Sequence, residues 1–411
     1  MSQNTTNSVV YFDNNATTKV APEVFEAMLP FLQEEYGNPS SMYGFAAKSQ
    51  QAVADARAQV ADLIGATPEE IIFTSCGTES DSTAIYAALR ARPDKRHFIT
   101  TRVEHPAVLA VANFVASQGY TVDYLDVDSQ GNIDLEQLKK LISGETALVS
   151  MMMANNETGV IFPVAEAAAI CRSYGVPMHT DAVQAVGKLA IDMKTLPVDY
   201  LALSGHKLHA PKGVGALYVR KGAGFRTFLR GGHQEHGRRA GTEAVPSLVA
   251  LGKACELAKT GFAVENTQVK ALRDTLENGL LAAIPESIIN GDATNRLPNT
   301  SNISFKYVEG EAILLLLNQF GICASSGSAC TSGSLEPSHV LRAMGVPFTY
   351  AHGSIRLSLS RYTTDKEVAF VLEKFPAIIA RLREISPYRN LDDDKVPDSC
   401  LSCGGSCAHA G

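Results

Sequence analysis

The stretch EIIFTSCGTESDSTAIYAALRA, residues 70–91, decides the fold class. Its first six residues are a short apolar run typical of a strand, and its last eleven form a helical pattern. Strand-like runs then recur up to residue 220: RHFITT, VDYLDV, ALVSMMMA, VPMHTDA, VDYLALSG and GALYVR. Helical patterns such as PAVLAVANFVASQG and PVAEAAAICRSYG lie between several of them. This alternation predicts an α/β fold with a mainly parallel, seven-stranded sheet covered by helices on both faces.

The sequence pattern changes after about residue 248. A long helical stretch there leads to the strand-like runs NTSNISFKY and SIRLSLS. With the helical segments GEAILLLLNQF and DKEVAFVLEKFPAIIARLREI, this is the pattern of a smaller α+β domain. We therefore expect four parts. Residues 1–15 are an N-terminal segment packing with the small domain, and 16–262 form the large domain. Residues 263–390 form the small domain, and 391–411 are a polar, cysteine-containing tail with little fixed structure.

Composition narrows the function classes. The 411 residues are 45% hydrophobic and 19% charged with a net charge of −7, which fits a globular protein and argues against broad binding to nucleic acid or anionic lipid. No apolar run is long enough to span a bilayer, and the start MSQNTTNSVV lacks the features of a signal peptide. We expect a cytoplasmic protein with no membrane or nucleic-acid partner. Of its eight cysteines, Cys76, Cys171, Cys255 and Cys323 lie in or beside apolar patterns and are expected to pack as small hydrophobic residues.

Three motifs carry candidate chemistry. In SGHKLHAPKGVGALYV, Lys207 follows a strand and is either a solvated loop lysine or an amine with a covalent task. In FTSCGTESDSTAI, the turn at Gly77 and Thr78 leads into a helix and is either a phosphate cradle or ordinary helix capping. In HTDAVQAVGK, Asp181 ends a strand and either caps the next helix or faces a cation such as the pyridine nitrogen of pyridoxal phosphate. The dinucleotide fingerprint and the Walker loop are absent.

The order of the motifs resembles one enzyme family. FDNNATT, GNPSS, NNETG, DAVQ, SGHK, RRAGTE and SSGSACTSGSLEPSHVL follow one another from residue 12 to residue 341. In this the chain is similar to the cysteine desulfurases of the aminotransferase class V group, which are pyridoxal-phosphate enzymes of fold type I. It is most similar to the NifS type, which supplies sulfur for iron–sulfur clusters in nitrogen-fixing bacteria.

The resemblance implies roles for single residues. Lys207 would bind the cofactor covalently, Asp181 would pair with its pyridine nitrogen, His105 would stack on the ring and Gln184 would bond the phenolic oxygen. The phosphate would be held by Gly77, Thr78, Ser204, His206 and, from a second subunit, Thr242, which implies a homodimer. Asn156 would contact the cofactor or the substrate carboxylate, which Arg356 would clamp.

Each of these residues also has a purely structural interpretation. His105 before Pro106 could open a helix, Asn156 could be a turn residue, Arg356 could form a surface ion pair, and the glycines near Thr242 could mark a bend. The right order and spacing of all the motifs together favour the functional interpretation.

The implied reaction converts L-cysteine to L-alanine. Cys330, in a loop of Ser, Gly and Ala, would attack the substrate sulfur and deliver it as a persulfide to an iron–sulfur scaffold protein, and the NifS resemblance implies a use in nitrogenase maturation. Lys207, His105 and Cys330 are thus the expected catalytic residues. The alternatives are a selenocysteine lyase or other class V enzyme, and a cofactor-free scaffold for cluster assembly.

The tail holds a separate motif. Cys400, Cys403 and Cys407 form C-x2-C-x3-C with His409 two residues on. This group could bind zinc or an iron–sulfur centre, relay sulfur as a mobile thiol tail, or be incidental. A transient iron–sulfur contact of Cys330 is a further metal-binding interpretation.

Overall fold

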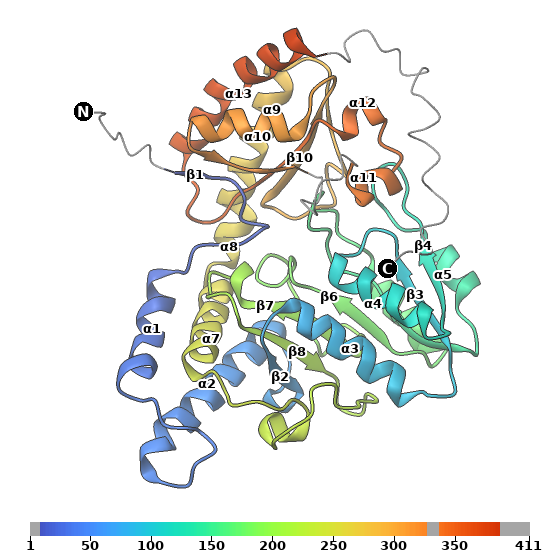
Figure 1. The fold of residues 1–411 in the computed structure, drawn as a ribbon, viewed down its shortest axis with the longest axis vertical. Helices are drawn as coiled ribbons and strands as arrows, with labels where there is room; N and C mark the ends of the chain where they lie inside the picture. Colours follow the sequence, from blue (N-terminus) through green and yellow to red (C-terminus); the bar gives the residue numbers. More distant parts are fainter. Residues whose placement is uncertain (1–8, 327–336, 387–411) are drawn as a thin grey trace.

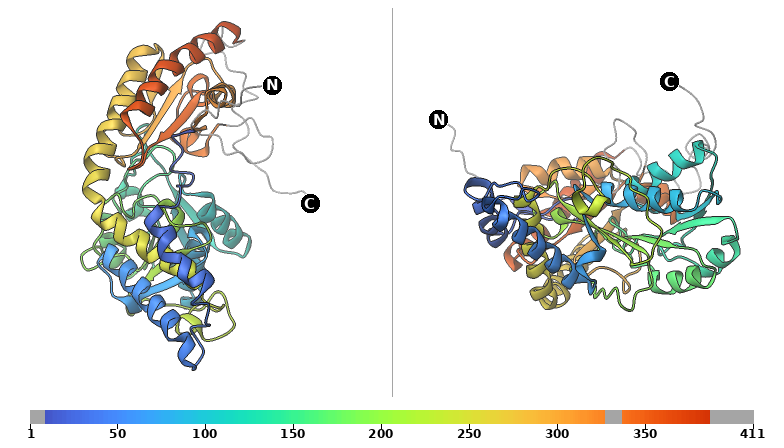
Figure 2. Two further views of the ribbon diagram at one scale, coloured as in Figure 1. Left: turned by 90° about the vertical axis from the view of Figure 1, so that its left-hand side faces the viewer. Right: turned by 90° about the horizontal axis from the view of Figure 1, so that it is seen from below.

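The computed structural model describes residues 9–326 and 337–386 of the chain. The two main sheets of the described chain lie one beyond the other along the longest axis, the larger at the bottom and the smaller at the top of Figure 1. Figure 2 shows that a series of helices runs along one side of the molecule from the first sheet to the second. None of the described helices combines the length and apolar character needed to cross a bilayer.

The larger sheet has seven strands in the order β2-β8-β7-β6-β5-β3-β4. Their bounds are Ile71–Thr74 (β2), His97–Thr101 (β3), Thr121–Leu125 (β4), Thr146–Ser150 (β5), Met178–Asp181 (β6), Tyr200–Ser204 (β7) and Gly215–Val219 (β8). Strands β7, β6, β5, β3 and β4 are parallel, whereas β8 runs antiparallel to its neighbours β7 and β2. The predicted mainly parallel, seven-stranded sheet is confirmed.

Helices cover both faces of this sheet, as expected for a mainly parallel sheet whose strands, apart from β4, are buried along their length. Ile72 and Phe98 pack on one face with α3 (Gly77–Ala91) and α4 (Pro106–Ser117). Phe73 and Ile99, one residue further along, pack on the opposite face with a second group of helices. That group contains α1 (Pro22–Gln33), α2 (Ala47–Ile64), α5 (Leu135–Leu141), α6 (Val164–Ser173) and α7 (Val245–Thr260).

The smaller sheet is antiparallel, in the order β12-β13-β10-β9. Its strands are β9 (Ser287–Ile289), β10 (Thr300–Phe305), β12 (Ser325–Ser326) and β13 (Ser354–Ser358). Its apolar core includes residues of α9 (Lys270–Ala283), α10 (Gly310–Gln319) and α13 (Asp365–Ile385). The N-terminal strand β1 (Val10–Tyr11) pairs in parallel with β11 (Ile322–Cys323), so the start of the described chain packs against this smaller unit.

The helix expected over residues 248–284 consists of several pieces that connect the two sheets. After α7 come α8 (Phe262–Val264), a π-helical turn η5 (Glu265–Val269) and α9. Such π-turns often mark functional positions in helices. The remaining helical elements are short: η1 (Gly44–Ala46), η2 (Pro68–Glu70), η3 (Gly205–Lys207), η4 (Gln234–Gly237), α11 (His339–Ala343) and α12 (Phe348–Ala351).

Candidate active site

A cavity of about 330 Å³ lies at the carboxyl ends of β6 and β7, where ligands of open α/β sheets bind. Residues of the larger sheet, of the α3 N-terminus and of β13 meet there, so both sheets contribute. The cavity is lined by ten of the residues that the sequence singled out: Gly77, Thr78, His105, Asn156, Asp181, Gln184, Ser204, His206, Lys207 and Arg356. The structure therefore brings most of the expected site together.

Lys207 enters this cavity from the short turn that follows β7. Its Nζ donates hydrogen bonds to the carbonyl oxygens of Asn15 at 2.5 Å and Ala16 at 2.7 Å. Burial, together with the positive charges of Arg356 and Lys188, lowers the pKa of Lys207 to about 7. About half of the Lys207 side chains are then neutral at pH 7, in the form that attacks a carbonyl carbon or accepts a proton. Lys207 is not a solvated loop lysine.

Lys188 is a second buried lysine close to Lys207. Both line a small cavity of about 20 Å³ together with Glu265 and Arg361. The Lys188 Nζ donates to the carbonyl oxygen of Gln184 at 3.1 Å, and burial lowers its pKa while the Glu265 charge raises it. A positive charge beside a reactive amine favours the neutral form of that amine. Lys188 lies in the HTDAVQAVGK motif, but the sequence predicts no role for it because only the fold brings it beside Lys207.

Three buried carboxyl groups gather at one end of the site. Asp181 ends β6 and accepts a hydrogen bond from the Val183 N–H at 2.9 Å. Burial raises the pKa of Asp181, and burial together with repulsion from Asp181 raises the pKa of Asp81 well above its usual range. Burial likewise raises the pKa of Glu104 to about 8. Among the described residues none of the three forms an ion pair with a lysine or arginine, so a ligand cation beside Asp181 would be strongly favoured.

Behind Asp81 lies His179, which is fully buried. Its Nε2 is 3.4 Å from Asp81 Oδ1, and its Nδ1 is 2.9 Å from the Ser150 hydroxyl. Burial lowers the pKa of His179 to about 3, so the ring is neutral and does not balance the carboxyl charges. Sequence patterns alone do not mark Asp81 or His179 as site residues.

His105 opens helix α4, as its structural interpretation proposed. Its Nδ1 accepts the Ala107 N–H at 3.1 Å, which assigns the proton of the neutral ring to Nε2. Burial lowers the pKa of His105, with Asp181 acting in the opposite direction. A neutral ring in the wall of the cavity is compatible with stacking on a planar ligand.

The N-terminus of α3 forms the opposite end of the cavity. The helix begins at Gly77, and its N-cap residue Cys76 makes no side-chain capping bond, so the alternative of ordinary capping is not realised. A Cβ on Gly77 would lie 2.8 Å from Val183 Cγ2, so only glycine allows this approach. The first N–H groups of α3 and the helix dipole therefore face the cavity as an anion site.

Two further polar side chains border this anion site. The Ser204 hydroxyl is buried without a hydrogen-bond partner among the described residues. His206 lies 3.2 Å through Nδ1 from the Thr17 hydroxyl, and burial lowers its pKa to about 4. His206 is thus neutral at pH 7 and contributes a hydrogen-bonding group rather than a charge.

Arg356 lies in β13 and is only 8% exposed, so it is not a surface residue. Its Nη1 donates to the Asn156 carbonyl oxygen at 2.9 Å and its Nη2 to Asp13 Oδ1 at 2.8 Å. The Nε is buried without a partner within the described part of the chain. A carboxylate ligand would therefore meet a guanidinium that is already oriented by two protein contacts.

Thr242 does not reach this cavity within its own chain. It is exposed and lines a separate cavity of about 150 Å³ together with Glu235 and Arg239. Arg239 Nε donates to Glu79 Oε1 at 2.7 Å, which ties the Thr242 segment to the first turn of α3.

The four remaining predicted residues, Cys330, Cys400, Cys403 and Cys407, lie outside the described residues. Within the described ranges no group of His, Cys, Asp or Glu side chains is arranged to hold a metal ion. The metal-binding interpretations of these cysteines therefore stay predictions.

Both neighbours of the Cys330 segment lie beside the cavity. On the N-terminal side, Ser325 in β12 is paired with Arg356 in β13. On the C-terminal side, the Ser338 hydroxyl donates to the Glu157 carboxylate, and His339 Nε2 lies 3.0 Å from the Glu104 carbonyl oxygen. The described chain thus leaves and returns next to residues of the site.

Comparisons with known proteins identify the family. The model of the aminotransferase class-V family matches residues 10–371. The chain belongs to the aminotransferase class-V family. This class-V chain is 60% identical over 383 residues to a cysteine desulfurase of Nostoc sp., covering 93% of this chain and 96% of the relative. It is 58% identical over 380 residues to the cysteine desulfurase NifS of Azotobacter vinelandii, covering 92% and 94%.

Solved structures agree with the class-V assignment. A NifS-like protein superposes with a TM-score of 0.86 at 40% identity, over 91% of this chain and 100% of the other. A structure described as SspA in complex with cysteine gives a TM-score of 0.77 at 34% identity, over 86% and 99%. The fold and the family predicted from the sequence are confirmed.

Proposed function

We infer that this chain is a cysteine desulfurase that uses pyridoxal phosphate to convert L-cysteine to L-alanine. One observation carries the inference. Lys207, with a pKa near 7, shares a cavity with the buried carboxyl group of Asp181 in a chain closely related to cysteine desulfurases. A cofactor-free scaffold has no use for this costly pair of buried groups.

The residues present fit the cofactor. The unpartnered Ser204 hydroxyl and the uncapped α3 N-terminus at Gly77 and Thr78 suit its phosphate, with His206 at their side. Asp181 is a buried carboxyl group with no lysine or arginine ion pair among the described residues, so it suits the protonated pyridine nitrogen.

Three more residues would complete the cofactor site. His105 would cover the ring, and Gln184, whose Oε1 is buried without a partner among the described residues, would bond the phenolic oxygen. Lys207 would carry the covalent link. When bound, pyridoxal phosphate withdraws electrons from the α-carbon of an amino acid.

The protein's own groups then bind the substrate and move its proton. Arg356 would hold the substrate carboxylate, with Asn156 beside it, and so fix the α-carbon near Lys207. The neutral Lys207 amine would accept the α-proton and return a proton later in the reaction. With a pKa near 7, the amine is matched to this exchange at neutral pH.

Cys330 would take the sulfur. Its thiolate attacks the substrate sulfur, a sulfur–sulfur bond forms and the carbon–sulfur bond of the substrate breaks. The electron pair of that bond stays with the carbon skeleton, which takes up a proton and leaves as L-alanine. In sum, L-cysteine and the Cys330 thiol give L-alanine and the Cys330 persulfide. The positions of Ser325 and Ser338 support this role, because the segment that carries Cys330 starts and ends beside the cavity.

We further propose an iron–sulfur scaffold protein as the acceptor, with nitrogenase maturation as the purpose, because a relative at 58% identity carries the name NifS. The free thiols of Cys76, Cys171, Cys255 and Cys323 support a reducing compartment, for which we propose the cytoplasm. We also propose a homodimer in which the exposed Thr242 reaches the phosphate site of the partner. Sedimentation should give twice the chain mass of 43.9 kDa, and a monomer at working concentrations would overturn this point.

The function is tested with the purified holoenzyme. Its visible spectrum should show bound cofactor, and added L-cysteine with a thiol reductant should yield alanine and sulfide in equal amounts. Alanine without sulfide, or cofactor without either product, would show that this chain catalyses another class-V reaction.

A further inference from the structure

A second cavity, of about 270 Å³, lies at the amino ends of the strands of the larger sheet, whereas the active-site cavity lies at their carboxyl ends. It borders the amino ends of β6 and β7, at Pro177 and Asp199, and the C-terminus of α3 at Arg92. Strands β6 and β7 and helix α3 each extend from this cavity to the active-site cavity. A ligand held here is therefore separated from the active site by the length of these elements, about 15 Å for a five-residue strand.

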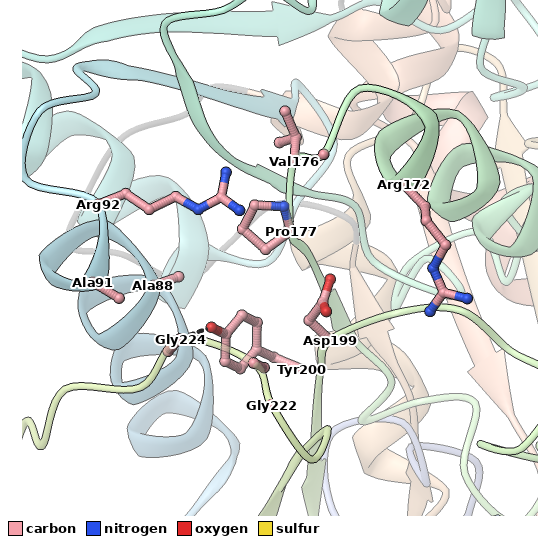
Figure 3. A pocket seen from close by; sticks show the side chains of 12 residues that line it. Ala88, Ala91, Arg92, Arg172, Val176, Pro177, Asp199, Tyr200, Gly222 and Gly224 are labelled. Atoms are coloured by element: carbon pink, nitrogen blue, oxygen red, sulfur yellow. Dashed lines mark hydrogen bonds between the residues drawn. The ribbon is translucent and has the colours of Figure 1, made fainter.

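Opposite charges face this cavity without pairing. Figure 3 shows Arg92 and Arg172 entering from two sides, with the Asp199 carboxylate between them. Burial raises the pKa of Asp199, and the Met178 N–H and the positive charges of Arg220, Arg172 and Arg92 act in the opposite direction. Among the described residues, neither Arg92 nor Arg172 forms an ion pair with Asp199. The charges are thus close enough to interact and still leave the space between them open.

Each charged group keeps hydrogen-bonding capacity for a ligand. One oxygen of Asp199 accepts the Met178 N–H at 2.8 Å, and the other has no partner in the described chain. The Arg92 guanidinium has no hydrogen-bond acceptor among the described residues, and Arg172 makes one long bond of 3.4 Å to the Pro197 carbonyl oxygen. A ligand with a carboxylate and an ammonium group would satisfy both signs of charge.

The rest of the wall is apolar and small. Ala88 and Ala91 of α3 face Val176 and the ring of Tyr200, whose hydroxyl donates to the Gly224 carbonyl oxygen and fixes that turn against the cavity. Such a wall suits a short aliphatic side chain rather than a further charge. Phosphate or a nucleotide would place its negative charge beside Asp199, at an electrostatic cost.

We propose that this cavity is a binding site for a small zwitterionic amino acid, whose carboxylate pairs with Arg92 and Arg172 and whose ammonium group pairs with Asp199. The site is independent of the reaction assigned to the other cavity. Its ligand class is the free α-amino acids with a short apolar side chain, of which L-alanine is the simplest chiral member.

The test is calorimetric titration of L-alanine into the holoenzyme. An Arg356→Gln background removes the carboxylate partner of the active site, so that the remaining binding reports this cavity. We expect that background to bind one L-alanine per chain. Adding Arg92→Gln should weaken binding at least tenfold, and Asp199→Asn should act similarly while still accepting the Met178 N–H. Arg90→Gln, on the same helix but outside the cavity, is the matched control and should change nothing.

Ligand fragments test the two-charge requirement. Propionate, which lacks the ammonium group, and ethylammonium, which lacks the carboxylate, should each bind at least tenfold more weakly than L-alanine. Equal binding of propionate would overturn the role of Asp199. Unchanged L-alanine binding in the Arg92→Gln protein, or none in the Arg356→Gln background, would overturn the site itself. Cysteine turnover measured on the single variant Arg92→Gln keeps this outcome separate from the proposed function, because that variant should retain it.

Discussion

Replacing Lys188 by glutamine should raise the pKa of Lys207 and slow cofactor uptake at neutral pH. Lys188 and Lys207 line one cavity of about 20 Å³, and the Lys188 charge is one of the causes that lower the pKa of Lys207 to about 7. Glutamine removes that positive charge. It also leaves the negative charge of Glu265 less compensated, and this too raises the pKa of Lys207. The neutral form of Lys207, which attacks the cofactor carbonyl, then becomes rarer.

The size of the effect follows from Coulomb's law. Two unit charges about 8 Å apart at an effective dielectric constant of ~20 interact by about 2 kcal/mol, or about 1.5 pKa units. With a wild-type pKa of about 7, half of the Lys207 amines are neutral at pH 7. A rise of about 1.5 units leaves about 3% neutral, so uptake at pH 7 should slow roughly 15-fold.

The assay mixes apoenzyme with excess pyridoxal phosphate and follows the absorbance of the bound cofactor from pH 6 to pH 10. The rate should rise with pH through a midpoint near 7 in the wild type and about 1.5 units higher in Lys188→Gln. Both proteins should reach the same plateau at high pH if the variant is folded. Lys212→Gln, which removes an exposed lysine, is the matched control and should leave the midpoint in place. Equal midpoints for Lys188→Gln and the wild type would refute the argument, and so would a wild-type midpoint above pH 9.

Other substitutions test the remaining parts of the site. Cys330→Ala should retain the cofactor absorbance and lose sulfide release from L-cysteine; wild-type sulfide production would remove Cys330 from the mechanism. Arg356→Gln should lower kcat/KM for L-cysteine roughly 10- to 100-fold through the loss of a charge-assisted pair, with Arg356→Lys recovering only part because lysine lacks the planar fork. Asp181→Asn keeps the bond to the Val183 N–H but loses the charge, so gel filtration should strip cofactor from this variant and not from the wild type. Burial raises the pKa of Glu104 from 4.5 to about 8, so the folded apoenzyme keeps a proton that the unfolded chain has lost between these values. Its stability therefore falls as the pH rises through this interval, and the thermal midpoint of Glu104→Gln should fall less than that of the wild type.

Much of the fold is predictable from the sequence because most strands of the larger sheet are short, buried apolar runs and its helices are amphipathic. The sequence predicts all seven strands of the larger sheet, including the half-buried β4. The strands β1, β9, β11 and β12 were not predicted, because two or three residues are too few to display a period. Helices α1 and α2 were also not predicted. Their apolar residues complete the core on one face of the larger sheet, an arrangement that only the fold reveals.

The residues of the candidate site also fall into two groups: those that the sequence predicts and those that only the structure reveals. Lys207 and Asp181 were found because charged residues at the ends of apolar strands need an explanation. The sequence gives no site role to Lys188, Asp81 or His179, because each acts on a residue that is distant in the chain or lies behind such a residue. Asp13 was seen only as part of the FDNNATT motif, yet its carboxylate orients Arg356 at 2.8 Å. Sequence patterns thus locate groups that end a strand or open a helix, whereas contacts between segments require the structure.

The most direct test of the central claim is a single turnover without reductant. Holoenzyme is mixed with one equivalent of L-cysteine. The mass of the peptide that carries Cys330 is then measured by mass spectrometry, and the amount of alanine formed is quantified. The account predicts one alanine per active site and a mass gain of one sulfur atom on Cys330. Alanine formed with no sulfur on Cys330, or sulfur bound first at Cys400, Cys403 or Cys407, would contradict it.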